Sequence, residues 1–271
     1  MLGTDLCAAA QGVGHQVTGF GHGTLDISNV QAVAAAVRES APDVVINCAA
    51  WTDVDGAESA FDSAMRVNAG GAGNVARAAT AAGAWTVHVS SDYVFDGSKR
   101  EPYVESDDVG PLSAYGRSKL EGELAVADGA PACHTIVRSS WLFGVAGRCF
   151  PAAILAAART REELTVVDDQ VGCPTFTGHL ARALIELAQA CVPGVLHVAG
   201  AGSCSWYEFA REIVEQAGLA CDVVPGRTVD LGRLAPRPAY SVLGTERPAQ
   251  APRLPDWRGG LEEYMSSAVR S

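Results

Sequence analysis

The amino-acid sequence predicts an α/β fold in which helices cover a doubly wound parallel sheet. Apolar runs of strand length, typical of strands buried on both faces, alternate with segments of helical length and pattern. The chain has 271 residues, enough for one large α/β domain with a smaller companion. Hydrophobic residues make up 48% of it and charged residues 19%, which is the composition of a globular protein rather than of a disordered chain.

Strand and helix alternate through the first half of the chain at the spacing of right-handed βαβ units. Residues 43–48 form a continuous apolar run, as expected for a strand inside a parallel sheet. Ser28 is the expected cap of the helix before that strand. In chain order we expect an opening helix, a strand at 15–20, a helix at 28–39, a strand at 43–48, a helix at about 59–82, a strand at 85–89, a helix from about 113 and a strand at 133–138.

The second half of the chain is punctuated by prolines, and its elements are shorter. A strand is expected at 194–198 and a helix at about 205–217. We therefore expect a main sheet domain over residues 1–140 and a smaller lobe over residues 141–271. Some segments of the second part are expected to return to the main sheet.

Charge and cysteine content limit the partners and the location of the protein. A formal net charge of -11 disfavours nucleic acid and anionic membranes as partners, because surfaces that bind phosphate chains carry a basic excess. The eight cysteines include no C-x-x-C pair and no cluster with histidines at metal-ligand spacing, so no metal site is expected. The sequence contains no run of about 18 apolar residues and no charged leader followed by an apolar stretch. We expect a soluble, cytoplasmic protein.

Three residues form a constellation suited to acid-base chemistry. Tyr115 and Lys119 are four positions apart, so on a helix they share one face and the ammonium can lie near the phenol. A tyrosine loses its proton at about pH 10, and a fixed cation beside it favours the phenolate. Ser91 follows a predicted buried strand, at the carboxyl end where ligands of such sheets bind. Its hydroxyl could bind a carbonyl oxygen while Tyr115 delivers a proton. Taken alone, a Tyr-x-x-x-Lys pair is common in surface helices.

A set of motifs follows in order along the chain, at 25–28, 42–55, 67–68, 90–97, 111–123, 138–144, 168–175 and 237–241. With this set the chain resembles the extended short-chain dehydrogenase/reductases and, within them, the dTDP-4-dehydrorhamnose reductase family of sugar-nucleotide 4-ketoreductases. The resemblance runs nearly from end to end. It implies a Rossmann-like, NAD(P)-binding domain over residues 1–140 and a lobe over residues 141–271 that mainly binds the substrate.

The resemblance implies a catalytic set of Ser91, Tyr115 and Lys119. Tyr115 would give a proton to the C4 ketone oxygen of a sugar while a reduced nicotinamide gives a hydride to C4, and Lys119 would hold the cofactor ribose and lower the pKa of Tyr115. Related 4,6-dehydratases have Glu at the position of Tyr93, so Tyr93 favours reduction over elimination of water. The resemblance implies cofactor contacts also for Leu2, Gly3, Asp26, Ile27, Cys48, Ala49, Ala50 and Asn68, and substrate contacts for Thr52, Asp92, Tyr93, Trp141, Gln170 and Arg237.

Several of these residues also have a structural interpretation. The carboxylate of Asp26 is suited to capping a helix or forming a turn. Asn68 would brace the sheet against a helix near the site. Trp141 alone would be assigned to the core, but at a strand's carboxyl end it becomes a platform for a sugar. Arg237 is a candidate for the substrate diphosphate. The glycines in the helix expected at about 59–82 indicate close helix packing.

The start of the chain departs from the family pattern. Folds of this type begin with a buried strand and a Gly-x-x-Gly-x-x-Gly turn whose amides face the cofactor pyrophosphate, whereas Gly3 resembles the last of these glycines. We expect a start assigned downstream of the true one, which upstream translation would test; a truncated form and a chain that has lost cofactor binding stay open. Residues 19–22 contain no acid that would repel a 2′-phosphate and no arginine that would attract one, so NADPH is favoured and NADH stays open.

The expected function is the NADPH-dependent reduction of the C4 ketone of a dTDP-4-keto-6-deoxy sugar, with dTDP-4-dehydro-β-L-rhamnose converted to dTDP-L-rhamnose. The protein would be an oxidoreductase of nucleotide-sugar biosynthesis that acts as a monomer or homodimer. Two alternatives stay open. One is a 4-ketoreductase or synthase for another dTDP-deoxysugar, in antibiotic or glycan biosynthesis. The other is a non-catalytic regulatory subunit resembling the β subunit of methionine adenosyltransferase.

Overall fold

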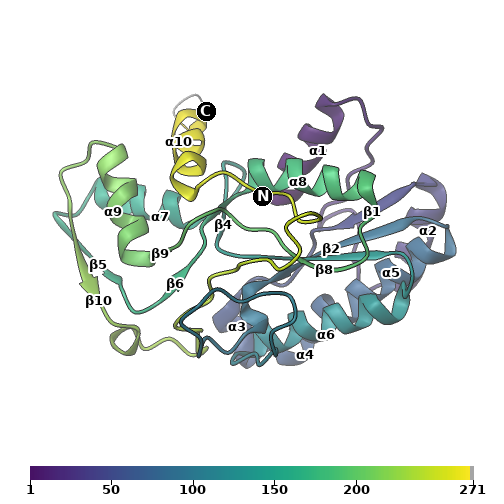
Figure 1. Ribbon diagram of the computed structural model, residues 1–271, viewed down its shortest axis with the longest axis horizontal. Helices are drawn as coiled ribbons and strands as arrows, with labels where there is room; N and C mark the ends of the chain where they lie inside the picture. Colours follow the sequence, from purple (N-terminus) through teal and green to yellow (C-terminus); the bar gives the residue numbers. More distant parts are fainter. Residues whose placement is uncertain (269–271) are drawn as a thin grey trace.

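In the computed structural model, which describes residues 1–268, four parallel strands form the main sheet. At least one helix separates each of these strands from the next along the chain, so every connection is a crossover. The predicted α/β fold with a parallel sheet is confirmed, and the last strand comes from beyond residue 140 (Figure 1). The strands are β1 (Val44–Asn47), β2 (Trp85–Ser91), β3 (His134–Ser139) and β8 (Gly194–His197), in the spatial order β1-β2-β3-β8.

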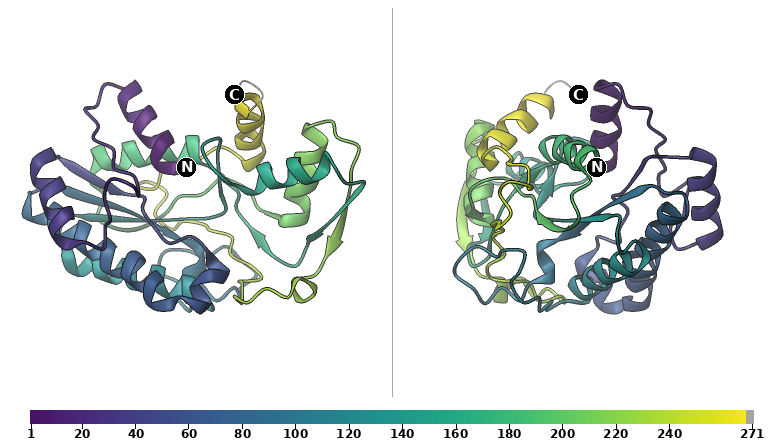
Figure 2. Two further views of the ribbon diagram at one scale, coloured as in Figure 1. Left: turned by 180° about the vertical axis from the view of Figure 1, so that it is seen from behind. Right: turned by 45° about the vertical axis from the view of Figure 1, so that its right-hand side comes forward.

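Helices cover both faces of this sheet (Figure 1 and Figure 2). Successive strand residues point to opposite faces. Val137 therefore packs into the core beneath α1 and α8, while Ile136 packs into the core beneath α5 and α6. The helices of the first layer are α1 (Leu2–Gly12) and α8 (Thr177–Ala190), and those of the second are α2 (Val30–Ser40), α5 (Ala72–Ala81) and α6 (Ala114–Gly129).

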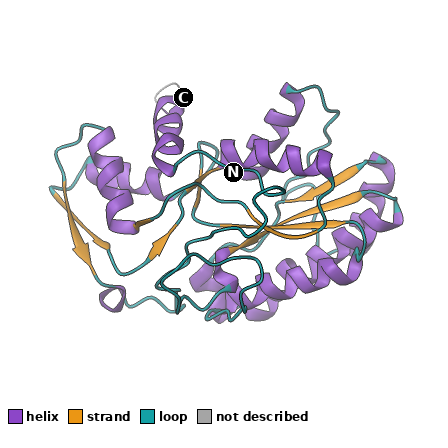
Figure 3. Ribbon diagram, in the orientation of Figure 1, coloured by secondary structure: helices purple, strands orange, loops and turns teal. Residues whose placement is uncertain are grey.

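A smaller lobe lies beside the main sheet (Figure 3). Its own apolar core contains Phe143, Phe209, Ile213, Trp257 and Leu261. Burial of these large side chains gives the lobe a core separate from the cores of the sheet. Its main elements are α7 (Phe150–Ala158), β5 (Glu163–Val167), α9 (Trp206–Gln216), β10 (Asp222–Gly226) and α10 (Trp257–Ala268), with β5 and β10 paired in parallel.

Short elements connect these parts. Two pairs of two-residue strands, β4 with β7 and β6 with β9, form small sheets apart from the main sheet. Among residues 1–268, none of the helices combines the length and the apolar character needed to cross a bilayer. The short elements are α3 (Val54–Ser59), α4 (Phe61–Met65), the π-helical η1 (Arg66–Gly71), the 3-10 helices η2 (Asp92–Val94) and η3 (Thr228–Leu231), β4 (Leu142–Phe143), β6 (Val171–Gly172), β7 (Thr175–Phe176) and β9 (Cys204–Ser205).

Two predictions at the first edge of the sheet are wrong. Residues 15–20 form no strand and are mostly exposed, Phe20 to 48%. β1 is half-buried over Val44, Val45 and Ile46 instead of buried on both faces. Both differences have one cause, because β1 is the edge strand of the described sheet and pairs only with β2. An extended segment without a hydrogen-bonded neighbour does not become a strand, whatever its apolar pattern.

Two helix predictions change in detail. The helix expected to be capped by Ser28 is α2, and its cap is Asn29, whose side chain accepts a hydrogen bond from the nitrogen of Ala32 at 3.1 Å. The long helix expected after β1 is divided into α3, α4, η1 and α5. A Cβ on Gly71 would lie 2.6 Å from Cγ1 of Ile27, so this glycine lets the loop before α2 approach η1. The close packing predicted at the glycines is confirmed here.

Candidate active site at the ends of the parallel strands

Ser91 ends β2 and turns the chain into η2. Its hydroxyl oxygen accepts a hydrogen bond from the backbone nitrogen of Tyr93 at 3.1 Å and thereby caps η2. The same hydroxyl donates to Oδ1 of Asp92 at 3.0 Å. The register of the sheet pairs Ser91 with Ser139, the last residue of β3. Ser91 therefore lies at the carboxyl end of two neighbouring parallel strands, where doubly wound sheets bind their ligands.

The first turns of α6 bring Tyr115 and Lys119 to this strand end. The helix begins near residue 113 as predicted, and Ser113 caps it, since its hydroxyl accepts a hydrogen bond from the nitrogen of Gly116 at 3.0 Å. Gly116 lets the helix approach η2, because a Cβ there would lie 2.3 Å from the carbonyl oxygen of Tyr93. The rings of Tyr115 and Tyr93 meet edge to face, with centroids 5.6 Å apart. The capped helix start thus fixes where both catalytic candidates lie.

Burial sets the protonation of these two groups. Lys119 is 2% exposed, and its Nζ donates to the carbonyl oxygen of Val89 at 2.8 Å. Burial lowers the pKa of Lys119 to about 8. Burial also raises the pKa of Tyr115 to about 12, although a hydrogen bond with Ser91 lowers it. Tyr115 therefore holds its proton at neutral pH, and a lowering of its pKa by Lys119 stays a prediction.

Asp92 is enclosed behind Ser91. Its side chain is 2% exposed, and its Oδ2 accepts a hydrogen bond from the hydroxyl of Ser241 at 2.6 Å. Burial raises the pKa of Asp92 to about 7, an effect larger than the lowering by the Ser241 and Ser91 hydroxyls. Ser241 is held by its own backbone, whose nitrogen donates to the carbonyl oxygen of Val171 at 2.8 Å. The sequence predicts that Asp92 reaches the sugar, whereas here both carboxyl oxygens are bound inside the protein.

Residues expected to contact the cofactor gather where α1 begins and β1 ends. α1 begins at Leu2, and no side chain in the described part of the chain caps its amino end. Gly3 faces Cys48, since a Cβ on Gly3 would lie 4.0 Å from the Cβ of Cys48. Burial raises the pKa of Cys48 to about 12, so its thiol is neutral. Ala49 is exposed and Ala50 half-exposed, and these small residues line the open side of the strand end.

Asp26 and Ile27 stabilise the loop before α2. Oδ1 of Asp26 accepts hydrogen bonds from the nitrogen and the hydroxyl of Ser28 at 2.9 and 2.8 Å, which is the turn-forming role considered from the sequence. The carbonyl oxygen of Ile27 accepts a hydrogen bond from Nδ2 of Asn74 at 3.1 Å. These contacts fix the loop, and an adenine contact of either residue stays a prediction.

Asn68 connects the loop after β1 to α6. Its Oδ1 accepts from the backbone nitrogen of Trp51 at 2.7 Å, and its Nδ2 donates to the carbonyl oxygen of Trp51 at 3.1 Å. Nδ2 also donates to the hydroxyl of Ser118 at 2.8 Å. Asn68 is 1% exposed. It therefore has the bracing position between sheet and helix that the sequence predicts, beside the helix that carries Tyr115.

Trp141 lies where β3 leaves the main sheet. Its φ of 47° is in the left-handed region, which is uncommon for a bulky residue. Its ring stacks on Trp206, the first residue of α9, with centroids 3.5 Å apart and planes 6° apart. Gly172 lies against the same indole, because a Cβ there would come within 2.5 Å of Cε2. Contacts from two other segments thus hold this half-buried ring between the main sheet and the lobe.

Arg237 joins the C-terminal segment to α3. Its Nη1 and Nη2 donate to Oδ1 and Oδ2 of Asp55 at 3.1 and 2.8 Å. The hydrogen bond from Arg237 holds the pKa of Asp55 below its usual value. Gln170 is 4% exposed, and its Nε2 donates to the hydroxyl of Thr228 at 2.8 Å. Thr52 is exposed in the loop before α3.

Three residues of the site have no role in the sequence predictions. Ser241 and Asp55 lie inside recognised motifs, but their partners are 149 and 182 positions away, so spacing alone could not reveal the contacts. Trp206 follows the cap of α9 and has the pattern of a core residue. No pattern in the sequence predicts that the Trp206 ring stacks on Trp141, the candidate sugar platform.

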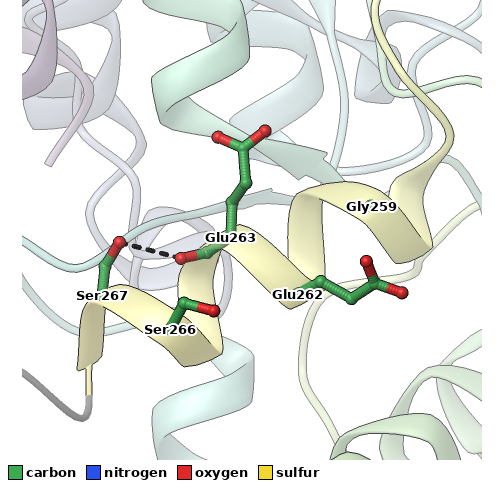
Figure 4. A pocket seen from close by; sticks show the side chains of 5 residues that line it. All are labelled: Gly259, Glu262, Glu263, Ser266 and Ser267. Carbon is green, nitrogen blue, oxygen red and sulfur yellow. Dashed lines mark hydrogen bonds between the residues drawn. The ribbon is translucent and has the colours of Figure 1, made fainter.

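A hollow of about 460 Å³ on the surface of α10 is separate from this site (Figure 4). Figure 4 shows Glu262 and Glu263 pointing to different sides of the helix. None of the candidate catalytic residues lines the hollow. Within residues 1–268 there is also no group of three or more His, Cys, Asp or Glu side chains suited to a metal ion. The residues that line the hollow are Gly259, Glu262, Glu263, Ser266 and Ser267.

Comparisons with known proteins cover nearly the whole chain. Residues 1–270 match the family model described as the RmlD substrate binding domain. A dTDP-4-dehydrorhamnose reductase of Mycolicibacterium smegmatis is 41% identical, over 99% of this chain and 83% of that protein. A dTDP-4-keto-6-deoxy-D-glucose reductase of Streptomyces niveus is 40% identical, over 90% of this chain and 85% of that protein.

A solved structure agrees over the same length. The crystal structure of dTDP-4-dehydrorhamnose reductase from Bacillus anthracis in complex with NADP has a TM-score of 0.95 at 37% identity, and the match covers 98% of this chain and 95% of that one. The chain belongs to the RmlD substrate binding domain family, the family of oxidoreductases that includes the dTDP-4-dehydrorhamnose reductases.

Proposed function

We propose that the protein catalyses the NADPH-dependent reduction of the C4 ketone of a dTDP-4-keto-6-deoxy sugar, converting dTDP-4-dehydro-β-L-rhamnose to dTDP-L-rhamnose. The observation that carries the proposal is the set of Ser91, Tyr115 and Lys119 at the carboxyl ends of parallel strands. A neutral tyrosine beside a serine hydroxyl and a buried lysine is suited to protonating a carbonyl oxygen. The name of the relative from Mycolicibacterium smegmatis, 41% identical, supports this reaction.

The residues present fit a dinucleotide. The amino end of α1 has no side-chain cap in the described chain, and the nitrogen of Thr4 bonds to the carbonyl oxygen of Met1, so the N–H groups of Leu2 and Gly3 and the positive dipole end are available to a diphosphate. Gly3 and the small residues at 48–50 let the dinucleotide pass close to the backbone. Lys119 would hold the ribose. The bound NADPH supplies the hydride that is added to C4 of the sugar.

Tyr115 is the proton donor in this reaction. As negative charge develops on the ketone oxygen, the phenol of Tyr115 transfers its proton to that oxygen, and the hydroxyl of Ser91 donates a hydrogen bond to it. Lys119 stabilises the phenolate that is formed, as long as its ammonium is charged. Tyr93 supports reduction over dehydration, because a phenol at this position supplies no carboxylate for removal of a proton from the sugar ring.

The remaining predicted residues would hold the sugar nucleotide. The sugar would contact the indole of Trp141. A guanidinium has five N–H donors, and three of those of Arg237 bond to Asp55 and Ala235. Within residues 1–268 the other two have no bonded partner, so Arg237 can bind a phosphate without leaving Asp55. Thr52, Tyr93 and Gln170 would complete the substrate contacts.

A second candidate substrate is another dTDP-4-keto-6-deoxy sugar. The relative from Streptomyces niveus, named for a 4-keto-6-deoxy-D-glucose reductase, is 40% identical. Ser91, Tyr115 and Lys119 would act on the C4 ketone of either substrate. Sugar stereochemistry would be selected by the lobe, through the segments that hold Trp141 and Arg237.

The test is a titration of NADPH, followed by fluorescence, and then an assay of NADPH oxidation with a panel of dTDP-4-keto sugars. We expect NADPH to bind and the fastest oxidation to occur with dTDP-4-dehydro-β-L-rhamnose. Tyr115→Phe should bind NADPH normally and lose at least about 100-fold in kcat, the usual contribution of a general acid. Binding of NADPH without oxidation by any 4-keto sugar would refute the proposal.

A further inference from the structure

The hydroxyl of Ser91 has a single hydrogen, and the structure shows where it goes. A serine hydroxyl donates one hydrogen bond and accepts two. Ser91 accepts from the nitrogen of Tyr93 at 3.1 Å and donates to Oδ1 of Asp92 at 3.0 Å. If Asp92 is ionised, its carboxylate can only accept, so the Ser91 hydrogen is committed to it. In that state Ser91 has no hydrogen left for a substrate carbonyl oxygen.

Ser241 makes the two carboxyl oxygens of Asp92 unequal. Its hydroxyl donates to Oδ2 at 2.6 Å, a shorter and stronger contact than the 3.0 Å between Ser91 and Oδ1, so negative charge is better stabilised on Oδ2 than on Oδ1. A proton added to the buried carboxyl is therefore placed on Oδ1, the oxygen that faces Ser91. The hydrogen bond between Asp92 and Ser91 then reverses its direction, because the carboxylic acid donates and the hydroxyl accepts. This reversal uses the second lone pair of Ser91 and frees its hydrogen, which can then be donated to the phenol oxygen of Tyr115 or to a substrate carbonyl oxygen.

We propose that Asp92 works as a neutral carboxylic acid which, with its proton held on Oδ1 by Ser241, turns the Ser91 hydroxyl toward the C4 carbonyl oxygen of the substrate. Asp92 and Ser241 are thus positioning residues: Asp92 acts through Ser91, and Ser241 acts through Asp92. The inference rests on the proposed function in taking Ser91 as the group that meets the carbonyl. It also gives Asp92 a role other than the sugar contact predicted from the sequence.

The surroundings of Asp92 favour its neutral form. Burial raises its pKa to about 7, and hydrogen bonds from the Ser241 and Ser91 hydroxyls and from the backbone of Asp92 and Tyr93 only partly offset this. The titratable groups that face it are Tyr93 on η2, Tyr115 on α6 and Cys173 between β6 and β7, and burial raises the pKa of each of them. All three are neutral near pH 7, so none of them offsets a negative charge on the carboxyl.

The nearby cations have other partners. Arg237 and Arg233, which act on Tyr93, lie within ion-pair distance of Asp55, at 2.8 and 3.7 Å. The ammonium of Lys119 donates to a backbone carbonyl. A carboxylate at Asp92 would therefore be a buried charge without an ion-pair partner in the described chain, which is the costly arrangement.

The protonation of Asp92 determines how activity changes with pH. The active form of Asp92 is the protonated one, so activity is full below its pKa of about 7 and is lost as the pH rises through that value. Above it, kcat/KM should fall about tenfold per pH unit. Lys119, with a pKa of about 8, loses its charge in the next unit.

The decisive variant is Asp92→Asn, since an amide has the shape and the polarity of a neutral carboxyl at every pH. Its Nδ2 can donate to Ser91 and its Oδ1 can accept from Ser241. At about pH 6, below the wild-type pKa of about 7, we expect the variant to retain turnover, and the deciding readout is its pH profile. The midpoint of the alkaline loss should move from about 7 to about 8, where Lys119 titrates. A 100-fold loss of kcat at all pH values, with NADPH binding intact, would overturn the proposal, and so would an unchanged midpoint.

Asp96→Asn is the matched control. The Asp96 carboxylate also accepts from two hydroxyls, those of Tyr103 at 2.6 Å and Ser98 at 3.0 Å, and it lies four residues further along the same segment. The hydrogen bond from Tyr103 lowers the pKa of Asp96, so it stays ionised across the range tested. We expect this variant to keep the wild-type pH profile. A shift as large as that of Asp92→Asn would show that loss of any carboxylate in this segment moves the profile, and would contradict the proposal.

An infrared measurement separates this inference from the proposed reaction. The difference spectrum of wild type minus Asp92→Asn should show the carbonyl stretch of a carboxylic acid at about pH 6, fading as the pH passes about 7. The band needs no substrate, so it tests the protonation of Asp92 even if no 4-keto sugar is turned over. Its absence at about pH 6 would mean an ionised Asp92 and would overturn the inference, whatever the outcome of the substrate panel.

Discussion

Glu123 and Arg138 form a buried ion pair between α6 and β3, and we expect the protein to depend on it strongly. Nε and Nη2 of Arg138 donate to the two carboxylate oxygens of Glu123 at 2.9 and 2.7 Å, and the side chains are 5% and 4% exposed. The hydroxyl of Ser90 donates to the same carboxylate at 2.6 Å. Glu123 is one helical turn beyond Lys119, so the pair connects the helix that carries Tyr115 and Lys119 to the strands behind it.

The expected magnitude follows from the burial of both partners. Glu123→Gln keeps the shape of the side chain but leaves the Arg138 guanidinium as a buried charge without its counter-ion. Removing one partner of a buried pair costs about 3–5 kcal/mol in the free energy of unfolding. Replacing both partners by apolar residues of similar size, as in Glu123→Leu with Arg138→Met, removes both charges together. We expect this double variant to recover most of the loss, because no unpaired charge remains.

The assay is urea unfolding followed by circular dichroism, with the free energy of unfolding extrapolated to water. Substrate turnover at saturating NADPH should be measured on the same preparations. Glu123→Gln should lose activity together with stability, because Tyr115 and Lys119 share its helix. A loss of less than about 1 kcal/mol in the single variant would refute the reasoning, since that is the range of an exposed pair. A double variant no more stable than the single one would refute it too.

Two further predictions concern glycine packing in the helices and the binding of the substrate diphosphate. Gly116→Ala would place a Cβ 2.3 Å from the carbonyl oxygen of Tyr93, so we expect a loss of about 1–3 kcal/mol in urea unfolding. Gly259→Ala in α10, with no atom within 4 Å of the new Cβ, should gain about 0.5–1 kcal/mol, and the opposite order of the two would contradict the packing argument. Arg237→Lys keeps the charge but loses the bidentate contact with Asp55, so KM for the sugar nucleotide should rise about tenfold in steady-state assays. An unchanged KM, or an equal loss of NADPH affinity, would count against a diphosphate role.

The parts of the structure that the sequence predicts well are those determined by neighbouring residues in the chain. The helix start near residue 113, the buried strand before Ser91 and the spacing of Tyr115 and Lys119 each depend on a few neighbouring residues. Those neighbours are present in any fold that the segment adopts. The helix, the strand and the side chains at their ends are therefore found where the sequence predicts them.

The errors come from contacts between distant segments. Residues 15–20 have the composition of a strand, but a strand also needs a hydrogen-bonded neighbour, and no spacing within the segment can supply one. The contact between Asp92 and Ser241 could not be predicted for a related reason, because Ser241 binds the second carboxyl oxygen from 149 positions away. The pKa of Tyr115 is set by burial, which likewise depends on the whole fold.

The hydrogen bond between Ser241 and Asp92 also bears on the order of events during folding. Contacts of long sequence separation require a large loop to close, and they form late. A nascent chain that ends at α8 already contains Ser91, Tyr115 and Lys119, yet the second oxygen of Asp92 has not met its donor. The hydrogen-bond geometry of the proposed site is therefore completed only after the segment that contains Ser241 has been synthesised, which follows the main elements of the lobe other than α10.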